Sequence, residues 1–256
     1  MTGATKAPRA VILAGQVGVL AVWLAAWQIV GPSQPVLLSS PAEVAGSLVE
    51  MLRSLQLPEL IVFTGRTFLL GWGISVVLGL AIGTLVGASR TVALMFEPFI
   101  NALYSTPKIV MIPLMILWFG LDLKAYVAAV VIGTVFPMMI MTITGIRNAG
   151  KEYVEIARSF RVRGAQLLYK VVIPGALPFI AVGLRLSLGR AIGGAIAAEF
   201  FLGGAGIGSA INQAGQSFQS AQMYGLILVI ALSAIVIDAI MRQAWARLAP
   251  VTPARA

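Results

Sequence analysis

The sequence predicts an all-α membrane protein: a polytopic bundle of about six transmembrane helices. The chain has 256 residues, of which 59% are hydrophobic and 11% are charged, and its mean hydropathy is +0.95. Soluble domains carry about 25% charged residues. An apolar helix of roughly 20 residues crosses a bilayer, so this length accommodates about six such helices and their loops. The whole chain, 1–256, is predicted to form one transmembrane domain.

The first predicted span, 10–30, follows Lys6 and Arg9 and in this respect is similar to a signal peptide. Its apolar run is longer than the usual 7–15 residues, and no clear small-x-small cleavage site follows. We therefore expect it to remain as an uncleaved span. A proline-rich extracytoplasmic segment, 31–63, comes next. Within it, Ser40 is predicted to cap a short surface helix that has Pro41 at its first position.

The later spans are interrupted by glycine and proline. The first of them carries consecutive GxxxG steps, which let two helices approach closely; packing within the chain is favoured there over a dimer contact. The next is interrupted by Pro107 and Pro113. A glycine-rich re-entrant or surface segment, 203–222, precedes the last span. The five later spans are predicted at 67–88, 98–119, 124–146, 177–200 and 223–246.

The distribution of Lys and Arg orients the chain. With the N-terminus in the cytoplasm, 12 of the 18 Lys and Arg residues lie in cytoplasmic segments and 3 lie outside. Cytoplasmic loops carry an excess of positive charge. Both termini and the loop 147–174 are therefore predicted to be cytoplasmic. The same bias accounts for the net charge of +9 without nucleic acid as a partner.

The loop 147–174 is unusually rich in charge, with seven charged residues between Lys151 and Lys170. On a helical wheel its charged residues lie opposite an apolar stripe, with Glu155 and Arg158 as an i, i+3 pair. Gly164 is expected to divide it into two short helices, and Pro174 and Pro178 to end it and start the next span. The wheel alone favours an amphipathic connector on lipid headgroups over a docking helix. The stripe contains Tyr153, Ala157, Phe160, Gly164, Leu167 and Val171.

Here the chain resembles the permease subunits of type I ATP-binding-cassette (ABC) importers, in their nitrate, sulfonate and taurine branch. Glu155-Ile156-Ala157 is similar to the EAA motif of that family's cytoplasmic loop. Arg161 stands where the family usually has glycine, so Gly164 is the expected bend. The other similar segments are Val171-Val172-Ile173-Pro174, Ala176-Leu177-Pro178, Pro107 to Gly120 (PKIVMIPLMILWFG), Gly183-Leu184-Arg185, Ala197-Ala198-Glu199 and Gly204-Ala205-Gly206-Ile207-Gly208.

The resemblance implies the type I ABC importer permease fold and a homodimer that encloses the translocation path. It implies that the loop forms a coupling helix, which docks on an ABC ATPase. Two ATPase copies would hold ATP and Mg, whereas this chain would bind no cofactor and no metal; it contains no GxxxxGK[ST] stretch. The residues to which the resemblance gives the coupling role are Glu155, Ala157, Arg158, Phe160, Arg161, Gly164 and Pro174.

The resemblance also implies a substrate class and a location. A soluble binding protein would deliver a small organic or inorganic anion, such as a sulfonate, nitrate or carboxylate, to the outer face of the permease. The contacting segments would be 31–63, 120–124 and 203–222. The protein would lie in lipid, in the bacterial cytoplasmic (inner) membrane. The sequence does not identify the substrate, and related members carry pyrimidine-like and aromatic compounds.

Several charged residues lie at or within the spans, where each is costly unless it is paired or hydrated. Lys108 and Asp238 are expected to extend toward an interface. Arg185, Arg190 and Glu199 each need a partner from another span, a second copy or an aqueous cavity. A structural ion pair is favoured, and a bidentate contact between an arginine and a transported anion is the alternative.

Methionines complete the candidate translocation path. Met111 and Met115, with Met138, Met139 and Met141, could form a soft gate, although ordinary core packing is favoured. The path candidates are Lys108, Met111, Met115, Arg185, Arg190 and Glu199.

Other functions have less support in the sequence. The chain has no Cys and no His, so a membrane enzyme would lack the usual catalytic groups. An ion-coupled secondary transporter is the main alternative, but it would need intramembrane acids and often carries an inverted repeat. Only Glu199 is a deep acid, and no internal repeat is evident. A channel filter is equally absent from the sequence.

Overall fold

A computed structural model describes residues 9–31, 37–148 and 151–248, and this part of the chain contains helices and turns but no strand. The all-α prediction is confirmed. The chain forms two compact units, Met1–Pro58 with Ala210–Val229 and Glu59–Ser209 with Ile230–Ala256. The predicted single domain stays a prediction. Among the residues on which predictions depended, Lys6, Pro32, Pro35 and Arg255 lie outside the described residues.

The first unit holds helix α1 (Arg9–Val30) and the predicted surface helix, α2 (Pro41–Arg53). The predicted start of α2 is confirmed: Ser40 accepts from the Glu43 amide, the Glu43 carboxylate accepts from the Ser40 amide, and Pro41 occupies the first turn. This reciprocal capping satisfies two backbone donors that α2 would otherwise leave without a partner. The hydroxyl groups of Ser39 and Ser220 are 2.6 Å apart, and this contact joins the segment before α2 to the start of α11 (Ser220–Leu248).

Within the described residues, five helices are long and apolar enough to cross a membrane, or up to six if one bent pair counts as a span. This agrees with the predicted number. Helix α3 (Gln56–Ala88) starts well before the predicted span start at 67, within the segment 31–63. Pro58 lies in its first turn, where a missing N–H costs no hydrogen bond. Further along the chain come the long helices α6 (Leu123–Asn148) and α9 (Ile173–Leu202), and then α10 (Gly206–Gln216), which is too short to span.

The predicted third span is broken, as its prolines indicated. Helix α4 (Arg90–Ser105) ends before Pro107, the 3-10 helix η2 (Lys108–Met111) follows, and α5 (Ile112–Phe119) completes the segment. The two halves meet at 88°. Since Pro107 donates no backbone hydrogen bond, the bend falls where the helix can be interrupted at least cost.

The glycine steps of α3 serve packing within the chain, the favoured alternative. A Cβ added to Gly79 would lie 2.7 Å from Cβ of Met138, and one on Gly83 would lie 2.6 Å from Cβ of Thr142. Both partners are on α6. Glycine therefore permits an approach of α3 to α6 that a larger residue would prevent.

Three methionines contribute to the core of the second unit. Met115 and Met138 are fully buried and Met139 nearly so, each in a different apolar cluster around α6. Met111 and Met141 are only half-buried. Core packing, the favoured alternative, is thus confirmed for Met115, Met138 and Met139.

Candidate functional site: the α7–α8 hairpin and the charged residues of the spans

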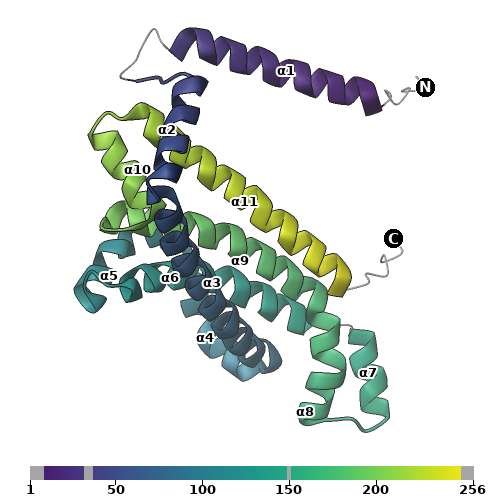
Figure 1. Cartoon of the computed structure of the whole chain (residues 1–256). Helices are drawn as coiled ribbons and strands as arrows, with labels where there is room; N and C mark the ends of the chain where they lie inside the picture. Colours follow the sequence, from purple (N-terminus) through teal and green to yellow (C-terminus); the bar gives the residue numbers. More distant parts are fainter. Residues whose placement is uncertain (1–8, 32–36, 149–150, 249–256) are drawn as a thin grey trace. The chain divides into compact units, whose positions relative to one another are not determined.

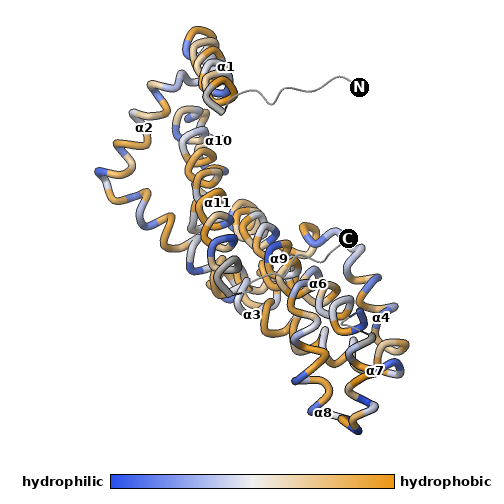
Figure 2. Tube along the Cα trace, turned by 90° about the vertical axis from the view of Figure 1, so that its right-hand side faces the viewer, coloured by the Kyte–Doolittle hydropathy of each residue, from blue (hydrophilic) through white to orange (hydrophobic). Residues whose placement is uncertain are grey.

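The charged loop folds into a hairpin at one end of the second unit (Figure 1). Helix α7 (Lys151–Ser159) runs beside α8 (Gly164–Leu167), which continues through the π-helical turn η3 (Leu168–Val172) directly into α9. Figure 2 shows hydrophilic residues at the turn of the hairpin and a mainly hydrophobic course along α6 and α9. The loop therefore projects from the apolar helices as a polar extension.

The prolines do not end the loop helix, contrary to prediction. The helical stretch is continuous from Gly164 to Leu202, and Pro174 sits in the first turn of α9. The physical reason lies in η3, where the Ile173 amide bonds back five residues to Leu168. A π-turn widens the helix, and in this way the backbone accommodates a proline ring that would collide with the carbonyl four residues earlier. The second arm of the hairpin, α8 with η3, and the span α9 therefore form one continuous helix.

The bend in the hairpin is at Arg161 and not at Gly164 alone, which corrects the prediction. Arg161 has φ +60°, a left-handed conformation, while Gly164 has φ +60° at the first residue of α8. The Val162 amide donates to the Ala157 carbonyl at 3.0 Å and the Arg161 amide donates to the Arg158 carbonyl at 2.9 Å. These two bonds form a Schellman C-cap, in which the left-handed position usually holds glycine. Arg161 thus adopts the conformation for which the family's usual glycine is suited.

Helix α7 presents two different faces. Tyr153, Ile156 and Phe160 are 69%, 55% and 78% exposed, and Ala157 between them is half-buried. At 100° per residue these four fall on one side of the helix. The opposite side carries Glu155 and Arg158, which form no ion pair with each other. An exposed aromatic and aliphatic stripe of this kind is typical of a surface that packs against another molecule.

A groove of about 580 Å³ lies under the polar face of α7. Glu155 and Arg158 face α8 across it, and the ends of α3 and α6 close it. Arg147, at the end of α6, is in turn ion-paired with Glu97 of α4 at 2.5 Å. The hairpin therefore lies against the ends of α3 and α6, and α6 is tied by this ion pair to α4. The groove is lined by Gly87, Ala88, Ile146, Arg147, Val154, Glu155, Arg158, Gly164, Leu167, Leu168 and Val172.

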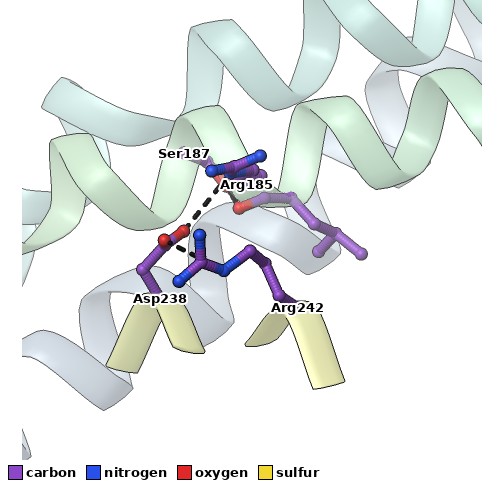
Figure 3. A network of polar contacts seen from close by, with 5 residues as sticks. Arg185, Ser187, Asp238 and Arg242 are labelled. Carbon is purple, nitrogen blue, oxygen red and sulfur yellow. Dashed lines mark hydrogen bonds and ion pairs between the residues drawn. The ribbon is translucent and has the colours of Figure 1, made fainter. Parts of the chain in front are cut away.

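Arg185 finds its partner in another span, the favoured alternative. Its Nε lies 3.2 Å from Oδ1 of Asp238 on α11, and Nε of Arg242 lies 3.4 Å from Oδ2. Figure 3 shows the Asp238 carboxylate between the two guanidinium groups. Asp238, expected to extend toward an interface, forms ion pairs with both arginines. The structure therefore explains Arg185 without a bound anion.

Lys108 and Arg190 have no acidic partner in the described part of the chain. The Lys108 ammonium donates to the Tyr104 carbonyl and lies 4.8 Å from the centroid of the Tyr104 ring. Arg190 donates from Nη2 to the Tyr104 hydroxyl at 3.1 Å, and its guanidinium carbon is 5.5 Å from the same ring centroid. Two elements far apart in the sequence, η2 and α9, thus bring two cations to one tyrosine.

Glu199 is fully buried, and its partners are hydrogen-bond donors instead of a cation. Its Oε2 accepts from the Thr64 hydroxyl and from the Gly208 amide, both at 2.9 Å, and the Thr64 hydroxyl accepts from the Ile207 amide at 2.9 Å. The carboxylate therefore holds the N-terminus of α10, where negative charge is favoured. Gly206 packs so closely on Glu199 that a side chain there would collide with the carboxylate.

Three important residues were not identified in the sequence. Thr64 lay outside the predicted spans, and Tyr104 and Phe136 carried no motif. Phe136 lies 5.3 Å from the Lys108 ammonium. A comparison of span midpoints could have found Phe136, which lies near the middle of the predicted span 124–146, as Lys108 and Arg190 lie near the middle of 98–119 and 177–200.

Known proteins share this organisation. Residues 75–250 match the family described as "Binding-protein-dependent transport system inner membrane component". The permease SsuC, named for aliphatic sulfonates transport, is 32% identical in Bacillus subtilis (87% of this chain, 82% of that protein) and 35% identical in Escherichia coli (91% and 90%). The taurine transport system permease TauC of Escherichia coli is 27% identical (91% and 88%).

The fold also has solved counterparts. An inward-facing structure of the MetNI methionine ABC transporter includes a chain that matches with a TM-score of 0.68 and 18% identity, over 75% of this chain and 96% of that one. The helical organisation described above is therefore shared with a chain of that transporter. By its sequence and its fold, the chain belongs to the binding-protein-dependent transport system inner membrane component family and is a multi-pass permease subunit of an ABC importer.

Proposed function

We propose that this permease carries a small anion inward through the bacterial inner membrane, as one of two identical copies that together enclose the path. Two ABC ATPase subunits, which hold ATP and Mg, supply the driving force, and a soluble binding protein delivers the anion outside. The relatives named for sulfonates and taurine support the substrate class. The excess of Lys and Arg in the loops supports cytoplasmic termini.

The exposed face of α7 is the observation that carries the proposal. Phe160 and Tyr153 are the most exposed side chains of the stripe, at 78% and 69%, although large apolar groups on a solvated loop gain by burial. The ATPase supplies that cover. Its movement on ATP binding pushes α7, and the groove beneath transmits the push to α3, α6 and α9. Arg161 and Gly164 shape the hairpin, and Pro174 lies where it joins α9.

Docking is tested by co-expressing the permease with the ABC ATPase of its transporter. Phe160→Ala and Ala157→Asp are expected to weaken ATPase retention at least about tenfold, because aromatic anchors dominate interface energy. Retention on the purified, membrane-inserted permease and substrate-stimulated ATP hydrolysis are the measurements. Phe218→Ala, which truncates a phenylalanine 69% exposed in the predicted outer segment, is the matched control.

Normal retention and coupling in both α7 variants would refute the docking role. Glu155→Lys gives a second readout, since it adds a cation to a groove already lined by Arg147 and Arg158. There the ATPase should stay bound while hydrolysis loses its dependence on transport substrate. This result would distinguish the face of α7 that docks, with Ala157 and Phe160, from the face that transmits the movement, with Glu155.

A further inference from the structure

We propose that Lys108 and Arg190, joined through Tyr104, form an anion-binding site within the membrane-spanning part of the permease, and that its ligand is a small oxyanion such as an alkanesulfonate or a carboxylate. The inference rests on the proposed transport function and extends it to a defined place on the path. Three observations carry it: the depth of the site, the charge imbalance around it and the hydrogen-bond donors it leaves open.

The depth follows from the spans. Phe136 and Arg190 lie near the middle of the long helices α6 and α9, and Lys108 lies at the bend between α4 and η2. All three surround Tyr104, whose ring lies 4.8 Å from the Lys108 ammonium and 6.5 Å from the Phe136 ring. Lipid phosphate lies at the edge of the hydrocarbon core, about 15 Å from the centre of a 30 Å core. A lipid headgroup is therefore poorly placed to reach this site, whereas a solute crossing the membrane must pass this depth.

Among the described residues, Lys108 and Arg190 differ from Arg147 and Arg185 in having no acidic partner. Arg185, on the same helix as Arg190, is ion-paired with Asp238, which it shares with Arg242, and Arg147 is ion-paired with Glu97. No acid in the described part of the chain pairs with Lys108 or Arg190. A pair of like charges at mid-membrane depth is costly unless an anion or water compensates it. The ring faces of Tyr104 and Phe136 offset this cost only in part.

The remaining donors suit an oxyanion. An ammonium has three donors and a guanidinium five, and the structure uses one of each: Lys108 on the Tyr104 carbonyl and Arg190 on the Tyr104 hydroxyl. The others can bind the oxygens of a sulfonate or carboxylate, in the bidentate manner that guanidinium favours. Half-buried Lys108 and exposed Arg190 leave the site open on the side of Arg190. The aromatic rings provide a surface for a short alkyl group.

The test measures binding of radiolabelled ethanesulfonate and acetate to the purified full-length permease in nanodiscs of phosphatidylcholine. Arg190→Gln and Lys108→Gln are each expected to weaken binding of the preferred anion at least about tenfold, as expected for loss of a charge-assisted hydrogen bond. Arg190→Lys should retain part of the affinity, which would show that the positive charge at this position is what the Arg190→Gln variant lacks. Arg242→Gln, which removes a cation while Asp238 keeps Arg185, is the control and should bind normally.

Failure of every anion to bind the wild-type protein, or equal binding by the Gln variants, would overturn the site. Nanodiscs with phosphatidylglycerol distinguish the other source of an oxyanion: retention of that lipid through Arg190, undisplaced by ethanesulfonate, would also overturn it. Neither result would affect ATPase docking, which is measured separately on α7. If docking fails while the anion still binds, the anion site stands and the proposed coupling does not.

Discussion

For single residues, the backbone conformation and the neighbouring charges determine a residue's role more than its type does. Arg161 is left-handed at the C-cap of α7, although an L-residue with a side chain is disfavoured there by about 1–2 kcal/mol. Arg185 and Arg190 lie close together on one helix, yet only the first has an acid beside it. Their roles therefore differ: Arg185 holds α9 to α11, and Arg190 remains available to a ligand.

Arg161→Gly is expected to strengthen the hairpin turn by about 1 kcal/mol, because glycine adopts positive φ without a Cβ clash. Hydrogen exchange at the Val162 amide, whose bond to Ala157 closes the turn, should slow about fivefold. Arg163→Gly is the matched control, since Arg163 is extended at φ −141° and gains nothing from glycine. Equal effects in the two variants would show that Arg161 is not strained.

At the scale of helices, the α7–α8 hairpin is connected to the membrane-spanning part by the close α3–α6 pair and by the continuous helix from α8 to α9. Gly79 and Gly83 bring α3 against α6, and the groove under α7 lies at the ends of these same helices. Helix α9 passes from the hairpin to the Arg190 site and on to Glu199, which holds the start of α10. One element therefore connects the proposed docking, binding and outer regions.

Gly79→Val should separate α3 from α6 and lower thermal stability in detergent, by about 1–3 kcal/mol for overpacking of a tight contact. Gly73→Val on the same helix is the control: a Cβ there has no neighbour within 4 Å. Thermal unfolding followed by loss of monodisperse protein compares the two. A similar loss for both would mean that β-branching within the helix, and not the α3–α6 approach, causes the effect.

For the complete permease, the orientation proposed from charge is open to a direct test, since the chain contains no cysteine. Ser159→Cys marks α7 and Ser217→Cys marks the segment between α10 and α11; both positions are exposed. A membrane-impermeant maleimide should label the Ser217→Cys variant in intact cells, and should label the Ser159→Cys variant only in inside-out vesicles. The reverse pattern would place the hairpin outside and exclude ATPase docking.

Local sequence was enough to predict the spans, the charged loop, the EAA-like motif and the cations within the membrane. These features follow from composition and spacing, because a long apolar helix is suited to a bilayer whichever neighbours it packs against. Ser40 was equally predictable as a helix cap, since capping depends on residues only a few positions apart. The break in the third span could be predicted too, because proline acts on its own backbone and its immediate neighbours.

The packing of the folded chain was needed to show which charges are neutralised and which face of α7 stays exposed. Arg185 and Asp238 are 53 residues apart, and Thr64 and Glu199 are 135 apart, so no local pattern pairs them. The π-turn before Pro174 and the left-handed Arg161 likewise depend on how the hairpin returns to its span. All of these features have one cause: a helix forms from neighbouring residues, but a counter-ion, a cap or a partner face comes from whichever element packs beside it.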